Sequence, residues 1–162
     1  MKKTSKLIAT VSLALALVFA LSGCDGLNWI WGTTAGPDID FDPNGGNHGT
    51  PDLPANNAGG GVAIPGWSVI TISAGQTEVT VDLPNPSANA DKYYLSFQMR
   101  LKDTGEVLFE TGYVAPGQSI NKVTLTRALE RGTYEVIIRV QPCRPDGSLT
   151  NNADMSTILV VK

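Results

Sequence analysis

Apolar and polar residues alternate along the chain from Trp67 to its end, which is the period of a half-buried β-strand. The alternation is clearest in Thr77–Leu83, Tyr93–Lys102 and Thr133–Gln141. Turn residues such as Gly, Pro, Asn and Asp separate these stretches, and no part of this region has a convincing helical period. Less regular strands are predicted at Ser68–Ser73, Glu106–Tyr113, Gln118–Leu125 and Met155–Val161.

Seven short half-buried strands predict an all-β fold, a seven-stranded Ig-like β-sandwich over residues 67–162. Tyr134 supports this fold, because it follows a Gly turn at the start of the penultimate strand. That position resembles the tyrosine corner of Ig-like domains, in which the hydroxyl bonds back to the turn. We therefore expect a structural role for Tyr134.

The N-terminus has the pattern of a lipoprotein signal peptide, predicted over residues 1–23. A basic start, Met1–Lys6, precedes an apolar run, Leu7–Leu21, that is short for a spanning helix. The sequence Leu21-Ser22-Gly23-Cys24 resembles the lipobox of bacterial lipoproteins. The resemblance implies cleavage before Cys24, a diacylglyceryl group on its thiol, and attachment to the extracytoplasmic face of the cell membrane.

Residues 24–66 have the composition of a linker rather than of a core. This segment holds ten of the 17 glycines, five of the ten prolines, five aspartates and no Lys or Arg. Such a sequence buries too little apolar area to offset its chain entropy, so we predict an acidic spacer. Within it, Asp38, Asp40 and Asp42 alternate like the start of a calcium loop, but Pro43 and Gly49 break that pattern. A solvated acidic linker is the favoured interpretation, and the lone His48 receives no role.

Two further features have alternative interpretations. Trp29 and Trp31 follow the lipid cysteine closely, so they either rest at the membrane interface or pack on the folded domain. Cys143 is the second of two cysteines, and lipidation of Cys24 leaves it no partner for an intramolecular disulfide. A partly buried structural thiol is favoured over a reactive one.

Charge limits the classes of partner. The formal net charge is −3, with 12 basic and 15 acidic residues, and no basic cluster lies outside the N-terminus. Nucleic-acid binding is therefore not expected. Removal of residues 1–23, which carry three lysines and no acid, would leave a more acidic mature chain.

The chain also resembles a group of small uncharacterised lipoproteins of Gram-positive, clostridial-type bacteria. The resemblance covers most of residues 64–162 and implies the location and an Ig-like C-terminal domain, but no activity or site. The stretches that carry it are Ile64–Trp67, Val81–Pro86, Leu101–Gly105, Val114–Gly117, Leu125–Leu129 and Gly132–Tyr134.

Catalysis is not expected, because the predicted sandwich has no His and its carboxylates are scattered. Glu106 and Glu110 share one strand face, and a glycosidase pair is the alternative to a structural role. We expect a non-catalytic module, without cofactor or metal, that binds a protein partner at the cell envelope. The candidate contact loops are Asn85–Asp91 and Pro142–Asn152.

Two other functions remain open. The first is a carbohydrate-binding module, for which the candidate ring-stacking residues are Trp67, Tyr94 and Tyr113. Two rings in an outward planar strip would support glycan binding. The second is an accessory subunit of a secretion, pilus or conjugation apparatus of the envelope.

Overall fold

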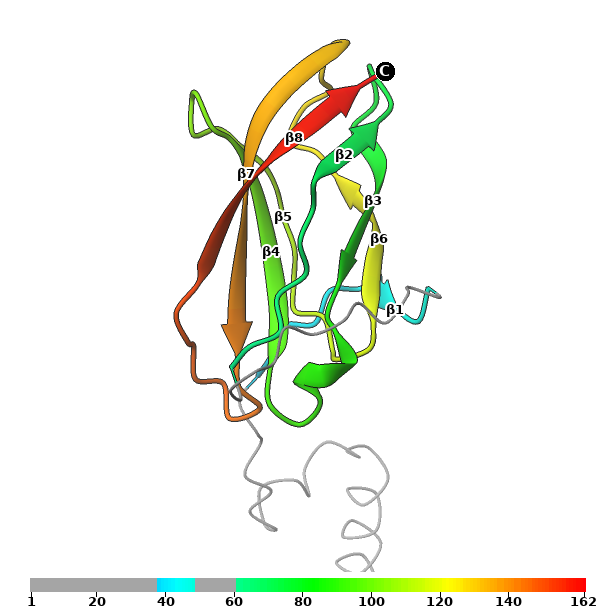
Figure 1. Cartoon of the computed structure of the whole chain (residues 1–162). Helices are drawn as coiled ribbons and strands as arrows, with labels where there is room; N and C mark the ends of the chain where they lie inside the picture. Colours follow the sequence, from blue (N-terminus) through cyan, green and yellow to red (C-terminus); the bar gives the residue numbers. More distant parts are fainter. Residues whose placement is uncertain (1–37, 49–60) are drawn as a thin grey trace, which may run out of the picture. The chain divides into compact units, whose positions relative to one another are not determined.

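A computed structural model describes residues 38–48 and 61–162, all of which belong to one compact unit, Pro37–Lys162. All seven predicted strands are present, and the fold is an all-β sandwich (Figure 1). In chain order they are β2 (Val69–Ile72), β3 (Glu78–Pro84), β4 (Tyr94–Leu101), β5 (Val107–Glu110), β6 (Ser119–Thr124), β7 (Gly132–Cys143) and β8 (Ala153–Val161). A short 3₁₀ helix, η1 (Ser87–Asn89), and a two-residue strand that was not predicted, β1 (Gly45–Gly46), complete the elements.

The strands form two sheets. The five-stranded sheet has the order β2-β8-β7-β4-β5, and the three-stranded sheet has the order β1-β6-β3. All neighbours are antiparallel except β2 and β8, which are parallel. As in Ig-like domains, the second and fifth of the seven strands, β3 and β6, lie in a different sheet from the third, sixth and seventh, β4, β7 and β8. The first and fourth, β2 and β5, join the sheet of β4, β7 and β8 here, whereas in Ig constant domains they join the other sheet.

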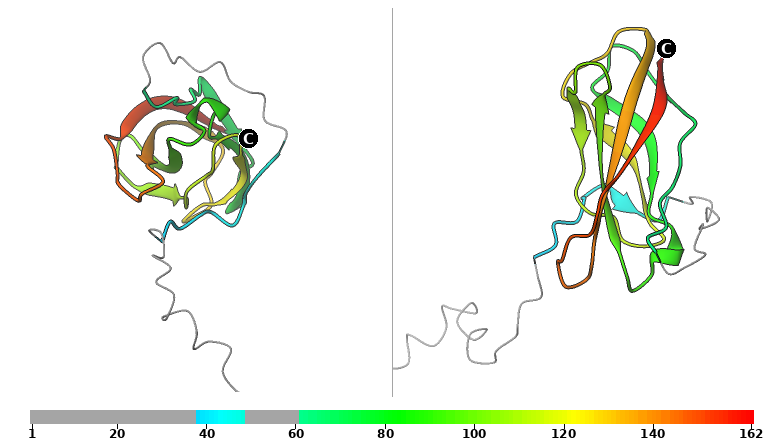
Figure 2. Two further views of the ribbon diagram at one scale, coloured as in Figure 1. Left: turned by 90° about the horizontal axis from the view of Figure 1, so that it is seen from below. Right: turned by 60° about the vertical axis from the view of Figure 1, so that its left-hand side comes forward.

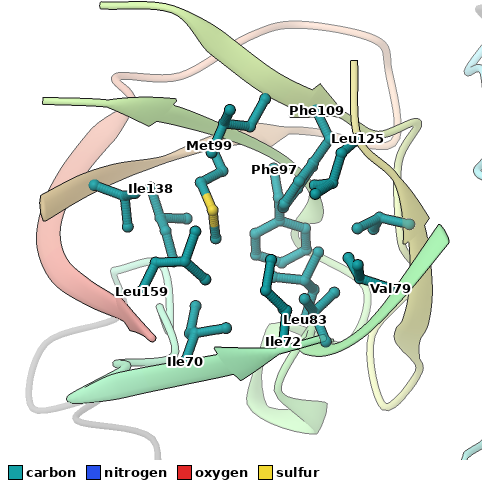
Figure 3. Packing of buried hydrophobic residues seen from close by; sticks show 14 of the residues in the cluster. Ile70, Ile72, Val79, Leu83, Phe97, Met99, Phe109, Leu125, Ile138 and Leu159 are labelled. Carbon is teal, nitrogen blue, oxygen red and sulfur yellow. The ribbon is translucent and has the colours of Figure 1, made fainter. Parts of the chain in front are cut away.

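The core lies between the two sheets, and alternate residues of β2, β3, β4, β7 and β8 form most of it (Figure 3). Phe97 and Met99 of β4 enter it from the five-stranded sheet, and Val79 and Leu83 of β3 from the other. Phe97 is 1% exposed and Leu83 is fully buried. The alternation in the sequence therefore corresponds to an inner and an outer face of each sheet.

Two segments expected in the linker are part of the folded unit, so the spacer prediction for residues 24–66 is wrong at these places. Residues 38–48, here called the strap, run along the side of the sandwich (Figure 2, left, cyan). Phe41 bridges Tyr113 beside β5, and β1 pairs with β6 of the other sheet. The strap thus covers edges of both sheets, which otherwise would present unpaired main-chain groups.

The second docked segment is residues 61–66, just before the predicted domain start at Trp67. Ala63 is 2% exposed, and Val62 and Ile64 pack against the core. The rest of the predicted linker, the signal peptide and the lipobox lie outside the described residues.

The corner before β7 has the geometry expected for Tyr134. Its hydroxyl donates a hydrogen bond to the main-chain carbonyl of Glu130 at 3.0 Å. This contact ties the start of β7 to the turn before it, as in a tyrosine corner. Across the described ranges, no helix has the length and apolar character needed to cross a membrane.

Candidate functional site

Four side chains with large apolar surfaces lie in a row across the outer face of the five-stranded sheet. They are Phe41, Tyr113, Tyr94 and Leu149, and we call them the outer-face band. Paired residues of neighbouring strands project on the same face. Tyr94 pairs with Cys143 and Cys143 with Leu149, while Tyr113 pairs with Phe41. The neighbours Leu95 and Val114 are buried in the core, so Tyr94 and Tyr113 project away from it.

The two ends of the band are the most exposed. Phe41 is 46% exposed and Leu149 is 62% exposed, whereas Tyr94 and Tyr113 are half-buried. The rings of Phe41 and Tyr94 meet edge to face, with centroids 5.0 Å apart and planes at 76°. The Phe41 and Tyr94 rings are therefore not coplanar, so the band is not a flat platform.

Cys143 lies in the middle of the band and is only 2% exposed. Its thiol donates to the carbonyl of Arg144 at 3.3 Å, and burial raises its pKa. Burial also raises the pKa of Tyr113, and the nearby Cys143 adds to that shift while a hydrogen bond with Ser96 opposes it. Both groups therefore stay neutral around pH 7, in agreement with a structural thiol.

The hairpin after β7 presents Leu149 in a fixed geometry. The amide of Arg144 donates to the carbonyl of Ser148 at 2.9 Å, and that of Thr150 donates to Pro142 at 3.1 Å. The Asp146 carboxylate accepts hydrogen bonds from the amide and hydroxyl of Ser148. The predicted contact loop Pro142–Asn152 is thus ordered, and it lies beside the first residues of the strap (Figure 1; Figure 2, right).

The other predicted contact loop, Asn85–Asp91, has a different role over its first part. Asn85 and Asn89 are both 1% exposed. The Asn89 amide makes two hydrogen bonds of 2.8 Å with the main chain of Ala63, and a third of 2.7 Å with Asn85. Asn85 in turn donates to the carbonyls of Tyr93 and Val114. These buried amides join residues 61–66 to the sandwich, while Ser87, Ala90 and Asp91 of the same loop are exposed.

Charged side chains above the band are paired with one another. Asp154 accepts hydrogen bonds from Arg139 at 2.8 and 3.0 Å and from Arg100 at 2.6 Å. The two guanidinium groups lower the pKa of Asp154 to about 2, with the Arg139 hydrogen bonds as the largest cause. The carboxylate is therefore ionised under ordinary conditions.

The carboxylates considered for catalysis do not form an acid–base pair. Glu106 makes a two-pronged ion pair with Arg127, at 2.7 and 2.8 Å, which lowers the pKa of Glu106. A general acid needs the opposite shift. Glu110 instead contacts the amide of Gln98 at 3.4 Å.

The three rings proposed for sugar stacking are separated by the fold. Tyr94 and Tyr113 share the outer face, but Trp67 does not join them. Its indole packs edge to face on the core residue Phe97, with centroids 5.9 Å apart, and donates to the carbonyl of Asp82 at 2.7 Å. Trp67 is therefore anchored on the core side.

Among the alternating aspartates of the strap, Asp42 uses its side chain for main-chain contacts. One oxygen of Asp42 accepts the amide of Asn44 at 2.8 Å, and the other accepts the amide of Gly112 at 3.0 Å. His48 contacts the carbonyl of Asn44 at 3.1 Å. Within residues 38–48 and 61–162, no three His, Cys, Asp or Glu side chains form a group that could hold a metal ion.

The lipidation residues cannot be placed by this geometry, because Leu21, Ser22, Gly23 and Cys24 lie outside the described residues. The band itself was missed as a whole, although Tyr94 and Tyr113 were named from the sequence. Phe41 carried no such indication, since it lies between aspartates in a segment with the composition of a linker.

No family model matches the chain, and a search of curated proteins found no match. Among solved structures, the crystal structure of CopC from Methylosinus trichosporium OB3b is similar, with 18% identity and a TM-score of 0.33. That similarity covers 59% of this chain and 86% of CopC.

Proposed function

We propose that this chain is a membrane-anchored lipoprotein of the cell envelope, and that its sandwich is a non-catalytic module that binds a protein partner. The observation that carries the binding role is the outer-face band. Leu149 and Phe41 are large apolar side chains that stay exposed, although the main chain of each is paired, Leu149 with Cys143 and Phe41 with Tyr113. Exposed apolar groups on a rigid frame, bordered by polar residues, are typical of protein contact surfaces.

The angle between the rings favours a protein side chain over a sugar ring. A sugar face stacks best on coplanar rings, and the planes of Phe41 and Tyr94 meet at 76°. The same-face neighbours of the band are polar, since Ser96 pairs with Gln141 two residues along β4 and β7 from the Tyr94–Cys143 pair.

The anchor is proposed from the lipobox at Leu21–Cys24 and from the resemblance to clostridial-type lipoproteins. Docking of the strap shortens the spacer in this account. Only 13 residues separate Cys24 from Asp38, and a chain of that length spans at most about 45 Å even when fully extended. The band would therefore face partners within that distance of the membrane surface. A Cys24→Ala variant should leave the membrane fraction of cells, and its retention there would contradict lipid anchoring.

A photo-crosslinking residue at position 149 tests the binding role in intact cells. We expect one discrete adduct, which should disappear when Tyr94→Ala, a band residue of β4, is added to the same chain. The matched control carries the crosslinker at Thr80, which is exposed on β3 of the opposite sheet. Equal adducts at both positions, or no specific adduct at 149, would overturn the proposal.

A further inference from the structure

The strap is held to the five-stranded sheet at a short length of main chain, Gly112–Tyr113, which continues β5 along β4. The amide of Tyr113 donates to the carbonyl of Asp40 at 2.8 Å, and its carbonyl accepts the amide of Asp42 at 3.0 Å. These two bonds are those of a parallel strand pair centred on Phe41 and Tyr113. On the other side, Val114 exchanges bonds with Leu95 of β4, so the strap adds an outermost strand to this sheet.

A carboxylate supplies the third contact. The Asp42 side chain accepts the amide of Gly112 at 3.0 Å, and a bond to a charged acceptor is stronger than one between neutral groups. The two main-chain bonds do not depend on sequence, whereas this third one selects an acidic residue.

The main chain of the strap comes so close to Gly112 that a larger residue does not fit there. A Cβ built on Gly112 would lie 2.6 Å from the main-chain nitrogen of Asp42 and 2.9 Å from the carbonyl oxygen of Asp40. Both contacts are with main chain, so no side-chain rotation relieves them. A Cβ on Gly66 meets nothing within 4 Å, which makes Gly66 a matched control.

We propose that Gly112–Tyr113 is a strand-acceptor site for an extended acidic segment of a protein partner, which replaces residues 40–42 of the strap. This inference rests on the proposed binding function and specifies the chemistry of the partner. The segment carries an aspartate where Asp42 stands and an apolar residue where Phe41 enters the outer-face band. Strand addition at a sheet edge is a general mode of peptide recognition.

The strap competes with the partner because it belongs to the same chain. A segment joined by a short connection acts at an effective concentration of the order of millimolar. A free peptide therefore binds the wild-type chain weakly, and a chain with a weakened strap binds it better.

The test uses a fluorescent peptide with the sequence of residues 38–48 and the full mature chain. We expect the peptide to bind a chain carrying Asp42→Ala at least about tenfold more tightly than the wild-type chain, since that substitution removes the charged contact of the competing strap. Adding Gly112→Ala to this chain should abolish binding, and adding Gly66→Ala should not. A peptide with alanine in place of its own aspartate at position 42 should bind about tenfold more weakly.

Two results would overturn the inference: no binding of the peptide to the Asp42→Ala chain, or equal binding with and without Gly112→Ala. If the chain with both Asp42→Ala and Gly112→Ala fails to fold, amide NMR of the Asp42→Ala chain shows where the peptide binds. The peptide should shift the Gly112 and Tyr113 amides, and binding without those shifts contradicts the site. Capture at position 149 does not use this edge, so failure of the peptide alone leaves the proposed function standing.

Discussion

The core strands and the two segments docked on them, residues 38–48 and 61–66, are held by different interactions. Core strands bury alternate apolar side chains, such as Phe97 at 1% exposure. The docked segments are held in addition by main-chain pairing and by polar side chains that reach main chain: Asp42 binds Gly112, and Asn89 binds Ala63. Burial spread over many residues produces a readable sequence pattern, whereas one well-placed polar contact does not.

The largest effect is expected in the core. Phe97→Ala removes a buried ring between the sheets, and truncation of this kind costs about 3–5 kcal/mol. Urea unfolding of the variant should show that loss of stability across the whole sandwich. A loss below about 1 kcal/mol would contradict the packing described for β4.

A smaller and more local effect is expected at the 61–66 contact. Asn89→Ala leaves the buried main-chain groups of Ala63 without their partners, which costs about 2 kcal/mol. Hydrogen exchange at the Ala63 amide should accelerate more than exchange in β7. The control is Asn151→Ala, at an exposed position of the hairpin, which should change neither.

Most of the strands could be predicted from the sequence because inner and outer residues alternate within them, as in β4. The docked segments could not, because their contacts join residues far apart in sequence: Asp42 with Gly112, and Ala63 with Asn89. Gly and Asn in these segments indicated a linker, yet Gly45 and Gly46 form a strand on β6. Only part of the outer-face band was predictable, for the same reason: Phe41 lies beside Tyr113 because the strap docks there, although the two residues are far apart in sequence.

The smallest effect concerns the ion pairs above the band. The pKa of Asp154 falls from its ordinary 3.8 to about 2 in the fold, mainly through Arg139. A carboxyl group with a lowered pKa adds stability above its unfolded pKa and loses it as pH falls through the folded value. The contribution should therefore disappear between about pH 4 and pH 2, and solvent screening limits it to about 1 kcal/mol.

The Asp154→Asn variant should lack that part of the acid transition, with the difference from wild type confined to pH above about 2. Asp82→Asn, on the exposed face of β3, is the matched control and should follow the wild-type curve. If the stability of Asp154→Asn and that of the wild type changed in parallel from pH 2 to pH 6, the ion pairs of Asp154 would not contribute to stability as described.

Hydrogen exchange at the Tyr113 amide reports directly on the docking of the strap, because that amide donates to the carbonyl of Asp40. The next amide, Val114, donates to Leu95 of β4 and serves as the internal reference. Gly112→Ala should accelerate exchange at Tyr113 at least about tenfold and leave Val114 unchanged, whereas Gly66→Ala should change neither. Unchanged protection of Tyr113 in Gly112→Ala would contradict a strap docked through this edge.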